Sequence, residues 1–135
     1  MSEPLTCDTS VLVPALAAWH PDHQRARTAL RDVTAVPAHV LLECYSVLTR
    51  LPQPHRISPS AAAAAVAGLS WPTLALPGEQ LPALLLELAE HNISGGAAYD
   101  GLVAATALHH GYALRSADQR ARRTYDVVGV QVLPL

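Results

Sequence analysis

The chain contains no lysine, so all nine of its Lys and Arg positions are arginines. A Walker A loop needs a lysine at the nucleotide phosphates, and haloacid-dehalogenase phosphatases and response-regulator receivers normally use one in their phosphate chemistry. The missing lysine therefore excludes the first class and argues against the other two. Phenylalanine is also absent, and the two Trp and four Tyr are few enough that we expect the core to take most of them.

Cysteine is scarce and long apolar runs are missing. Cys7 and Cys44 lie far apart, with no C-x-x-C motif and no partnering histidine motif, which argues against a zinc site or redox pair and favours two reduced, packed thiols. No apolar run reaches the roughly 18 residues of a membrane span, and no basic segment followed by a long apolar one opens the chain. We therefore expect a cytoplasmic protein without a membrane anchor.

What is present is an apolar chain of one-domain size. With 135 residues, 50% of them hydrophobic, and a net charge of -2, it can form one core and has no room for a second domain, which predicts one domain over 1–135. Strand-like segments at 5–8, 33–36, 71–76, 112–116 and 130–133 alternate with helical patterns at 11–19, from 21 onward, 38–50, 60–69, 80–91, around 100, and 119–125. This alternation predicts an α/β fold with a mostly parallel sheet and helices on both faces.

Four acids occupy similar places in this pattern. Asp8 ends one predicted strand and Asp118 closely follows another, where an open α/β sheet keeps its ligands. Asp100 shares a helical face with the apolar Val103, and Glu43 borders the apolar stripe of its own helix. A carboxylate buried without compensation is costly, so such acids are usually paired, hydrogen-bonded or bound to metal.

Each acid alone could be a helix cap or a solvated side chain, because charged residues are mostly exposed. The four together stand apart from the remaining acids, because each breaks or borders an apolar segment. The acids on polar faces or in turns are Glu79, Glu87, Glu90 and Asp126. We therefore hypothesise that the four converge on one site.

Segments around these acids carry a family resemblance: CDTSVL at 7–12, LE at 42–43 with VL at 47–48, YDGLVAATA at 99–107, and LRSAD at 114–118. In this order and spacing they resemble the PIN domain, and more closely the toxin nucleases of VapBC toxin–antitoxin pairs. The resemblance implies a single PIN-like domain with a five-stranded, mostly parallel sheet of order 3-2-1-4-5, flanked by helices. It also implies that the acids gather at one end of the sheet and hold Mg²⁺ or Mn²⁺.

The resemblance assigns roles to individual residues. The catalytic acids would be Asp8, Glu43, Asp100 and Asp118. The metal ligands would be Asp8, Asp100 and Asp118. The hydroxyls expected to support these ligands are Thr9, Ser10 and Ser116. Hard divalent ions held by carboxylates can activate water, stabilise a pentacovalent phosphate and neutralise the leaving oxygen, which is the chemistry of phosphodiester hydrolysis.

Four arginines surround the last acid: Arg115, Arg120, Arg122 and Arg123. They would suit a track for the RNA backbone beside the site, or they could form a solvated helix face, which is what many charge runs are. The seven histidines include His20-x-x-His23 and His109-His110 but no H-E-x-x-H arrangement, so we expect them at the surface or at helix ends.

These features predict a metal-dependent endoribonuclease that acts as the toxin of a toxin–antitoxin pair. The expected partners are an RNA substrate, a VapB-type antitoxin that covers surplus apolar helix surface, and a second copy in a homodimer. Two alternatives stay open. One is a non-catalytic PIN-like RNA-binding or scaffold protein, although degenerate members typically lose an acid. The other is a phosphatase, disfavoured because Ser10 stands where a D-x-D motif needs its second Asp.

Overall fold

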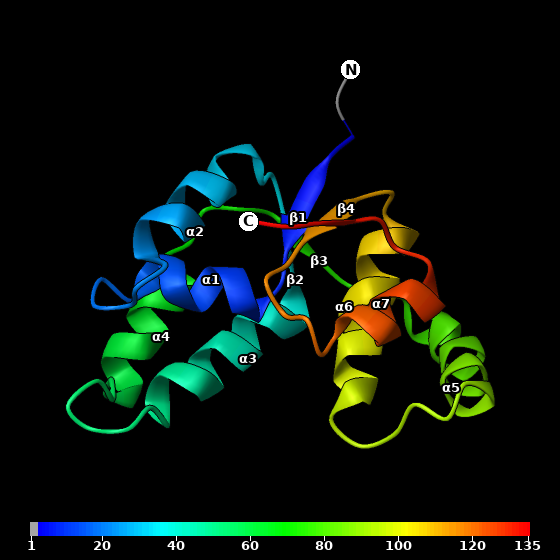
Figure 1. Cartoon of the computed structure of the whole chain (residues 1–135). Helices are drawn as coiled ribbons and strands as arrows, with labels where there is room; N and C mark the ends of the chain where they lie inside the picture. The colour runs from blue at the N-terminus through cyan, green and yellow to red at the C-terminus, as the bar shows by residue number, and fades with distance from the viewer. Residues whose placement is uncertain (1–2) are drawn as a thin grey trace.

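The computed structural model describes residues 3–135 and shows helices on both sides of short strands (Figure 1). The strands are β1 (Leu5–Cys7), β2 (Val36–Pro37), β3 (Thr73–Leu74), β4 (Ala113–Arg115) and β5 (Val132–Leu133). The α-helices are α1 (Thr9–Leu16), α2 (His23–Ala29), α3 (Ala38–Thr49), α4 (Pro59–Ala67), α5 (Leu81–Glu90), α6 (Ala97–His109) and α7 (Arg122–Val128). The predicted alternation of strands and helices is confirmed. Over the described residues, no helix is long and apolar enough to cross a membrane.

The strands form two parallel sheets. One contains three strands in the order β1-β4-β5, and the other pairs β2 with β3. The prediction of one five-stranded sheet of order 3-2-1-4-5 is therefore wrong. The break falls between β1 and β2, where Leu5 makes an isolated bridge with Val33 and the Thr6 hydroxyl donates to the carbonyl of Ala35 at 2.7 Å. This side-chain donor satisfies the carbonyl without extending the backbone ladder.

The first helix starts at Thr9, two residues before the predicted 11–19. Asp8 is the N-cap of α1, because its carboxylate accepts a hydrogen bond from the amide of Ser10. Helix α4 begins at Pro59, one residue before the predicted 60–69, with Ser58 as its N-cap. A strand-ending carboxylate thus also fixes where the next helix begins.

The last helix starts later than predicted. Oδ1 of Asp118 accepts hydrogen bonds from the amides of Arg120, at 2.9 Å, and Ala121, at 3.2 Å. These bonds hold 118–121 as a turn, so α7 begins at Arg122 rather than at 119.

The core lies between the strands and the inner faces of α3 and α6. α3 buries Val40, Cys44 and Leu48, and the helical face of α6 that contains Val103 and Ala107 is buried as expected. In Figure 1, α1 to α4 lie to the left of β1 and α5 to α7 to its right, and the carboxyl end of β1 lies between α3 and α6. Acids at the strand ends and on these two helices are thereby brought to one region.

Candidate active site

Asp8 is the most enclosed of the four acids. It follows β1 directly, is only 4% exposed, and accepts hydrogen bonds at both carboxylate oxygens. Oδ1 accepts from the amide of Ser10 at 3.0 Å and from its hydroxyl at 2.5 Å. Oδ2 accepts from the hydroxyls of Ser116 at 2.5 Å and Tyr125 at 2.6 Å. Donors from α1, the β4–α7 loop and α7 therefore fix the orientation of this carboxylate.

The environment of Asp8 acts on its pKa in two directions. Burial raises the pKa, and the hydrogen bonds from Ser10, Ser116 and Tyr125 oppose this by favouring the ionised form; the net shift is upward. Burial also raises the pKa of Tyr125, and the neighbouring Asp8 raises it further, so the phenol stays protonated and donates. The pair is a buried carboxylate held by neutral donors.

The loop after β4 ties Asp118 to Asp8 through two serines. The Ser116 hydroxyl accepts from the amide of Asp118 at 3.1 Å while it donates to Asp8. The Ser10 hydroxyl likewise accepts from the amide of Ala117 at 2.8 Å. Because β1 and β4 are parallel neighbours, with Cys7 paired to Arg115, their carboxyl ends meet at the same edge.

Glu43 reaches the same region from the inner side of α3. The Thr9 hydroxyl donates to its Oε1, and Nε2 of His39 lies 3.8 Å from its Oε2. The predicted supporting hydroxyls thus lie where the resemblance implies: Thr9 contacts Glu43, and Ser10 and Ser116 contact Asp8.

Asp100 differs from the other acids because its carboxylate makes no hydrogen bond within residues 3–135. Burial first, and then the charges of Asp118, Glu43 and Asp8 in that order, raise its pKa from 3.8 to about 6, against the opposing effect of Arg120. The other three predicted acids therefore lie close enough to act on Asp100 electrostatically. The site carries more negative charge than its own residues neutralise.

The four acids line one cleft with a volume of about 400 Å³. Its other walls are Thr9, Ser10, Val13, Pro14, His20, Val47, Arg50, Arg120 and Tyr125. The sequence reasoning missed three polar members of this cleft: His20, Arg50 and Tyr125. The burial of Tyr125 could have been predicted from the sequence, because Ala121, Tyr125 and Val128 recur at helical spacing. All three are buried, in α7 or just before it.

Of the four arginines predicted to follow the RNA, Arg120 lines the cleft. The guanidinium groups of the other three contact the protein itself: Arg115 donates to the carbonyl of Pro134, Arg122 to Asp126, and Arg123 to the carbonyl of His91. Arg115 lies on the far side of β4 from the acids, beside Asp32 and Leu135. The cleft instead brings in Arg50, from the end of α3.

The donor set fits a hard divalent cation, although the described residues place no three His, Cys, Asp or Glu side chains close enough to enclose an ion unaided. Carboxylate oxygens are the protein ligands of Mg²⁺, which usually keeps several waters and takes only one or two carboxylates. Asp100 has both oxygens free of hydrogen bonds from residues 3–135, and it is the acid whose charge its neighbours destabilise. A cation at this cleft would relieve that repulsion.

A family model described as the PIN domain matches residues 5–127. The chain belongs to the PIN domain family. Among curated proteins, it is similar to ribonuclease VapC40 of Mycobacterium tuberculosis, with 46% identity over 126 residues that cover 93% of this chain and 94% of VapC40. It is also similar to ribonuclease VapC27 of the same species, with 41% identity and 98% of each chain covered.

Solved structures share this PIN domain fold at lower sequence identity. VapC20 of M. tuberculosis, described as a Sarcin-Ricin loop cleaving toxin, matches with a TM-score of 0.69 and 19% identity, covering 88% of this chain and 93% of its own. DNA-bound VapBC from Salmonella typhimurium matches with a TM-score of 0.68 and 17% identity, covering 98% of both chains. The PIN domain of VapC type predicted from the acid-bearing segments is thereby confirmed.

Proposed function

We propose that this PIN domain is a metal-dependent endoribonuclease and the toxin of a toxin–antitoxin pair. The observation that carries the proposal is the convergence of four carboxylates on one cleft, where burial and the charges of the other three raise the pKa of Asp100. Such a cluster has no structural advantage, because packed like charges destabilise a fold. The names of the relatives VapC40 and VapC27 support ribonuclease activity.

Each acid has a distinct part in this proposal. Asp8, Asp100 and Asp118 would hold Mg²⁺ or Mn²⁺, which when bound supplies an activated water and charge neutralisation at the phosphate. Glu43, oriented by the Thr9 hydroxyl, would accept the proton of the attacking water as its oxygen bonds to phosphorus and the ribose oxygen leaves. Arg120 and Arg50 line the cleft beside them and would contact the phosphate backbone.

Mapping of cleavage ends on total RNA tests this function. We expect discrete new ends with Mg²⁺ or Mn²⁺, none with chelator, and none with Asp100→Asn. The matched control is Asp126→Asn, which removes a solvated acid of α7 that pairs with Arg122. RNA that stays intact with wild-type protein and metal, while still binding to it, would instead support the non-catalytic binding module.

An antitoxin is the second partner that we propose. Structures similar to this chain include VapBC from S. typhimurium and FitAB bound to DNA, the latter with a TM-score of 0.63, 18% identity, and 96% of this chain and 94% of that chain covered. On this chain α5 buries Leu84 and Leu88 but leaves Leu85 60% and Leu86 74% exposed. Exposed leucines of this kind mark interaction surfaces. A homodimer would cover part of the same exposed apolar surface, which also includes Leu42 on α3.

Co-expression with the product of the adjacent upstream reading frame tests the antitoxin. We expect the two proteins to co-purify and the second to relieve growth arrest caused by the first, in the cytoplasm where the RNA is. Growth arrest without co-purification would leave a nuclease and remove the toxin–antitoxin assignment.

A further inference from the structure

The cleft extends well beyond the four acids. From the carboxylates it runs between α1 and α3 over an apolar floor of Val13, Pro14 and Val47. It ends at His20, in the loop after α1, and at Arg50, just past the end of α3. Six residues of helix separate Asp8 from Pro14, about 9 Å at 1.5 Å per residue. This arm of the cleft, defined by Val13, Pro14, His20, Val47 and Arg50, has no part in the metal site.

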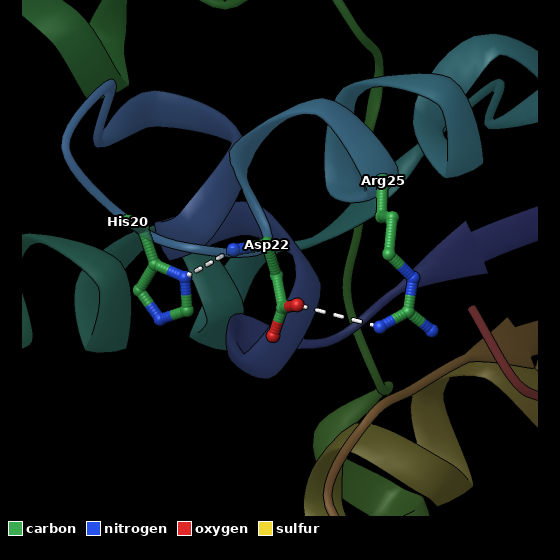
Figure 2. Close-up of polar contacts among 3 residues, drawn as sticks. All are labelled: His20, Asp22 and Arg25. Carbon is green, nitrogen blue, oxygen red and sulfur yellow. Dashed lines mark hydrogen bonds and ion pairs between the residues drawn. The ribbon is translucent and has the colours of Figure 1, made fainter.

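His20 presents a defined donor at the end of the arm. Its Nδ1 accepts a hydrogen bond from the amide of Asp22 at 3.0 Å (Figure 2). Because a backbone amide can only donate, the neutral ring carries its proton on Nε2. The Asp22 carboxylate is bonded to Arg25 at 3.3 Å, and Figure 2 shows the second ring nitrogen of His20 pointing away from both. The Nε2–H group is therefore available to a ligand.

Trp19 lies beside His20, next to the residues that line the cleft, and is one of the few aromatics outside the core. Its indole is 44% exposed. One side stacks on the ring of His55, with centroids 3.9 Å apart and planes at 18°, and the His20 ring lies 5.6 Å away at a tilt. The indole is thus supported by His55 and remains partly open to solvent.

Arg50 supplies positive charge on the opposite wall of the arm. It is exposed, and its guanidinium forms no hydrogen bond or ion pair within residues 3–135. An unpaired arginine and a ring N–H at one end of a cleft suit a phosphate group, because both only donate. The apolar floor and the open indole suit a base.

We propose that the arm is a subsite for the single-stranded RNA nucleotide next to the scissile phosphate, with its base stacked on Trp19 and its phosphate held by His20 Nε2–H and Arg50. The inference rests on the proposed nuclease function and adds the way in which a substrate is aligned. Splayed, unstacked bases are what proteins read in RNA, and aromatic stacking with cationic backbone contacts is how single strands are held. The competing role of Trp19 is structural, namely to join the loop after α1 to the loop after α3 through His55.

Tryptophan fluorescence distinguishes the two roles without relying on cleavage. The Trp71→Phe variant leaves Trp19 as the sole tryptophan, because the chain has two. It is titrated in chelator with an oligoadenylate dodecamer and with a ribose-phosphate dodecamer that lacks bases. We expect quenching and saturable binding with the first, and binding about tenfold weaker with little quenching for the second.

Variants then assign the contacts. We expect Trp19→Ala to weaken oligoadenylate binding by about tenfold and Trp19→Phe to restore most of it, because the aromatic face is retained. His20→Ala and Arg50→Ala should weaken binding of both dodecamers, whereas His109→Ala, an exposed histidine far from the arm on α6, should not.

Wild-type affinity in Trp19→Ala, together with unquenched Trp19 in the Trp71→Phe protein, overturns the subsite even if RNA is cleaved. Absence of cleavage by wild-type protein with metal, together with base-dependent quenching, overturns the nuclease function and leaves a nucleotide-binding arm. If Trp19→Ala does not fold, Trp19→Phe and the quenching measurement still decide.

Discussion

The two walls of the cleft hold the same kind of residue in opposite ways. At the strand-end wall, Asp8 is 4% exposed and receives hydrogen bonds from Ser10, Ser116 and Tyr125. At the helix wall, Asp100 has no hydrogen bond within residues 3–135, and burial together with the charges of the other three acids raises its pKa to about 6. One carboxylate is fixed by the fold, and the other stays unsatisfied until a cation or proton arrives. The site is therefore preorganised at Asp8 and electrostatically primed for a cation at Asp100.

The largest expected effect is on RNA cleavage, which substitution of Asp8 and substitution of Asp100 should reduce alike. We expect Asp8→Asn and Asp100→Asn each to lower RNA cleavage by at least about a hundredfold, because each removes a charge that the metal needs. The measurement is the rate of cleavage of an RNA that spans a mapped site, with Asp126→Asn as the control. Undiminished activity in both variants would remove the metal-site assignment.

The free energy of unfolding should respond differently to substitution of Asp8 and of Asp100. From the sequence alone, relief of charge repulsion predicts that both Asn variants are as stable as the wild type or slightly more so. The contacts change this expectation for Asp8, because an amide nitrogen would face donors: we expect Asp8→Asn to cost about 2 kcal/mol. Asp100→Asn should leave the free energy of unfolding unchanged or raised by up to about 1 kcal/mol, a small value because Asp100 is partly exposed. Urea unfolding at neutral pH measures both, and equal shifts would contradict the comparison.

Tyr125→Phe tests the fixed wall with the least change of shape. It deletes the hydroxyl that donates to Asp8 at 2.6 Å, inside the core. We expect a loss of about 1 kcal/mol in unfolding free energy and a severalfold drop in cleavage rate, because the carboxylate loses one of its donors. Tyr112→Phe, at a partly buried tyrosine outside the cleft, is the matched control and should be near neutral. A silent Tyr125→Phe would mean that the other donors suffice.

The pH dependence of the unfolding free energy tests whether the environment of Asp100 destabilises its charged form. The pKa of Asp100 rises from 3.8 to about 6 on folding, so the folded state binds the proton of Asp100 more tightly than the unfolded state does. The contribution of this proton to the unfolding free energy is therefore lost as the pH rises from about 4 to above 6. Asp100→Asn has no such loss. Its stability relative to the wild type should therefore increase from pH 4 to above pH 6, the window set by those two values. A constant difference across this range would show that Asp100 is not strained by its neighbours.

The smallest expected effect concerns the thiols of Cys7 and Cys44, each of which is next to a site acid in the sequence. Cys7 precedes Asp8 and Cys44 follows Glu43, but both are fully buried, and burial raises the pKa of each, that of Cys44 to about 12. We expect almost no labelling of native protein by a thiol reagent over minutes, and complete labelling in denaturant. Rapid labelling of the native protein would mean that a thiol faces the cleft instead of the core.

The sequence predicted the parts of this site that follow from periodicity. The alternation of elements, the ends of β1 and β4, and the inward face of α6 that contains Val103 all came from apolar spacing. The family resemblance supplied the identity of the domain. Both depend on information that is local in the chain or repeated across a family.

What the sequence did not predict depends on contacts between distant residues. Between the separate sheets of β1 and β2, the Thr6 hydroxyl bonds the carbonyl of Ala35, 29 positions away. Tyr125 reaches Asp8 across 117 positions. His20 enters the cleft from the loop after α1, whose course no local pattern specifies, and Arg50, at the end of the predicted helix, meets it only because α1 packs beside α3. Such contacts are fixed by tertiary packing, which overrides local preference.

Binding of Mn²⁺, followed by its paramagnetic resonance signal at a pH above 7, tests the central claim most directly, because it requires no knowledge of the RNA. We expect saturable binding to the wild type and to Asp126→Asn, binding at least about tenfold weaker in Asp100→Asn, and a loss of affinity as pH falls below about 6, where Asp100 takes up a proton. Equal Mn²⁺ affinity in wild type and Asp100→Asn would contradict it.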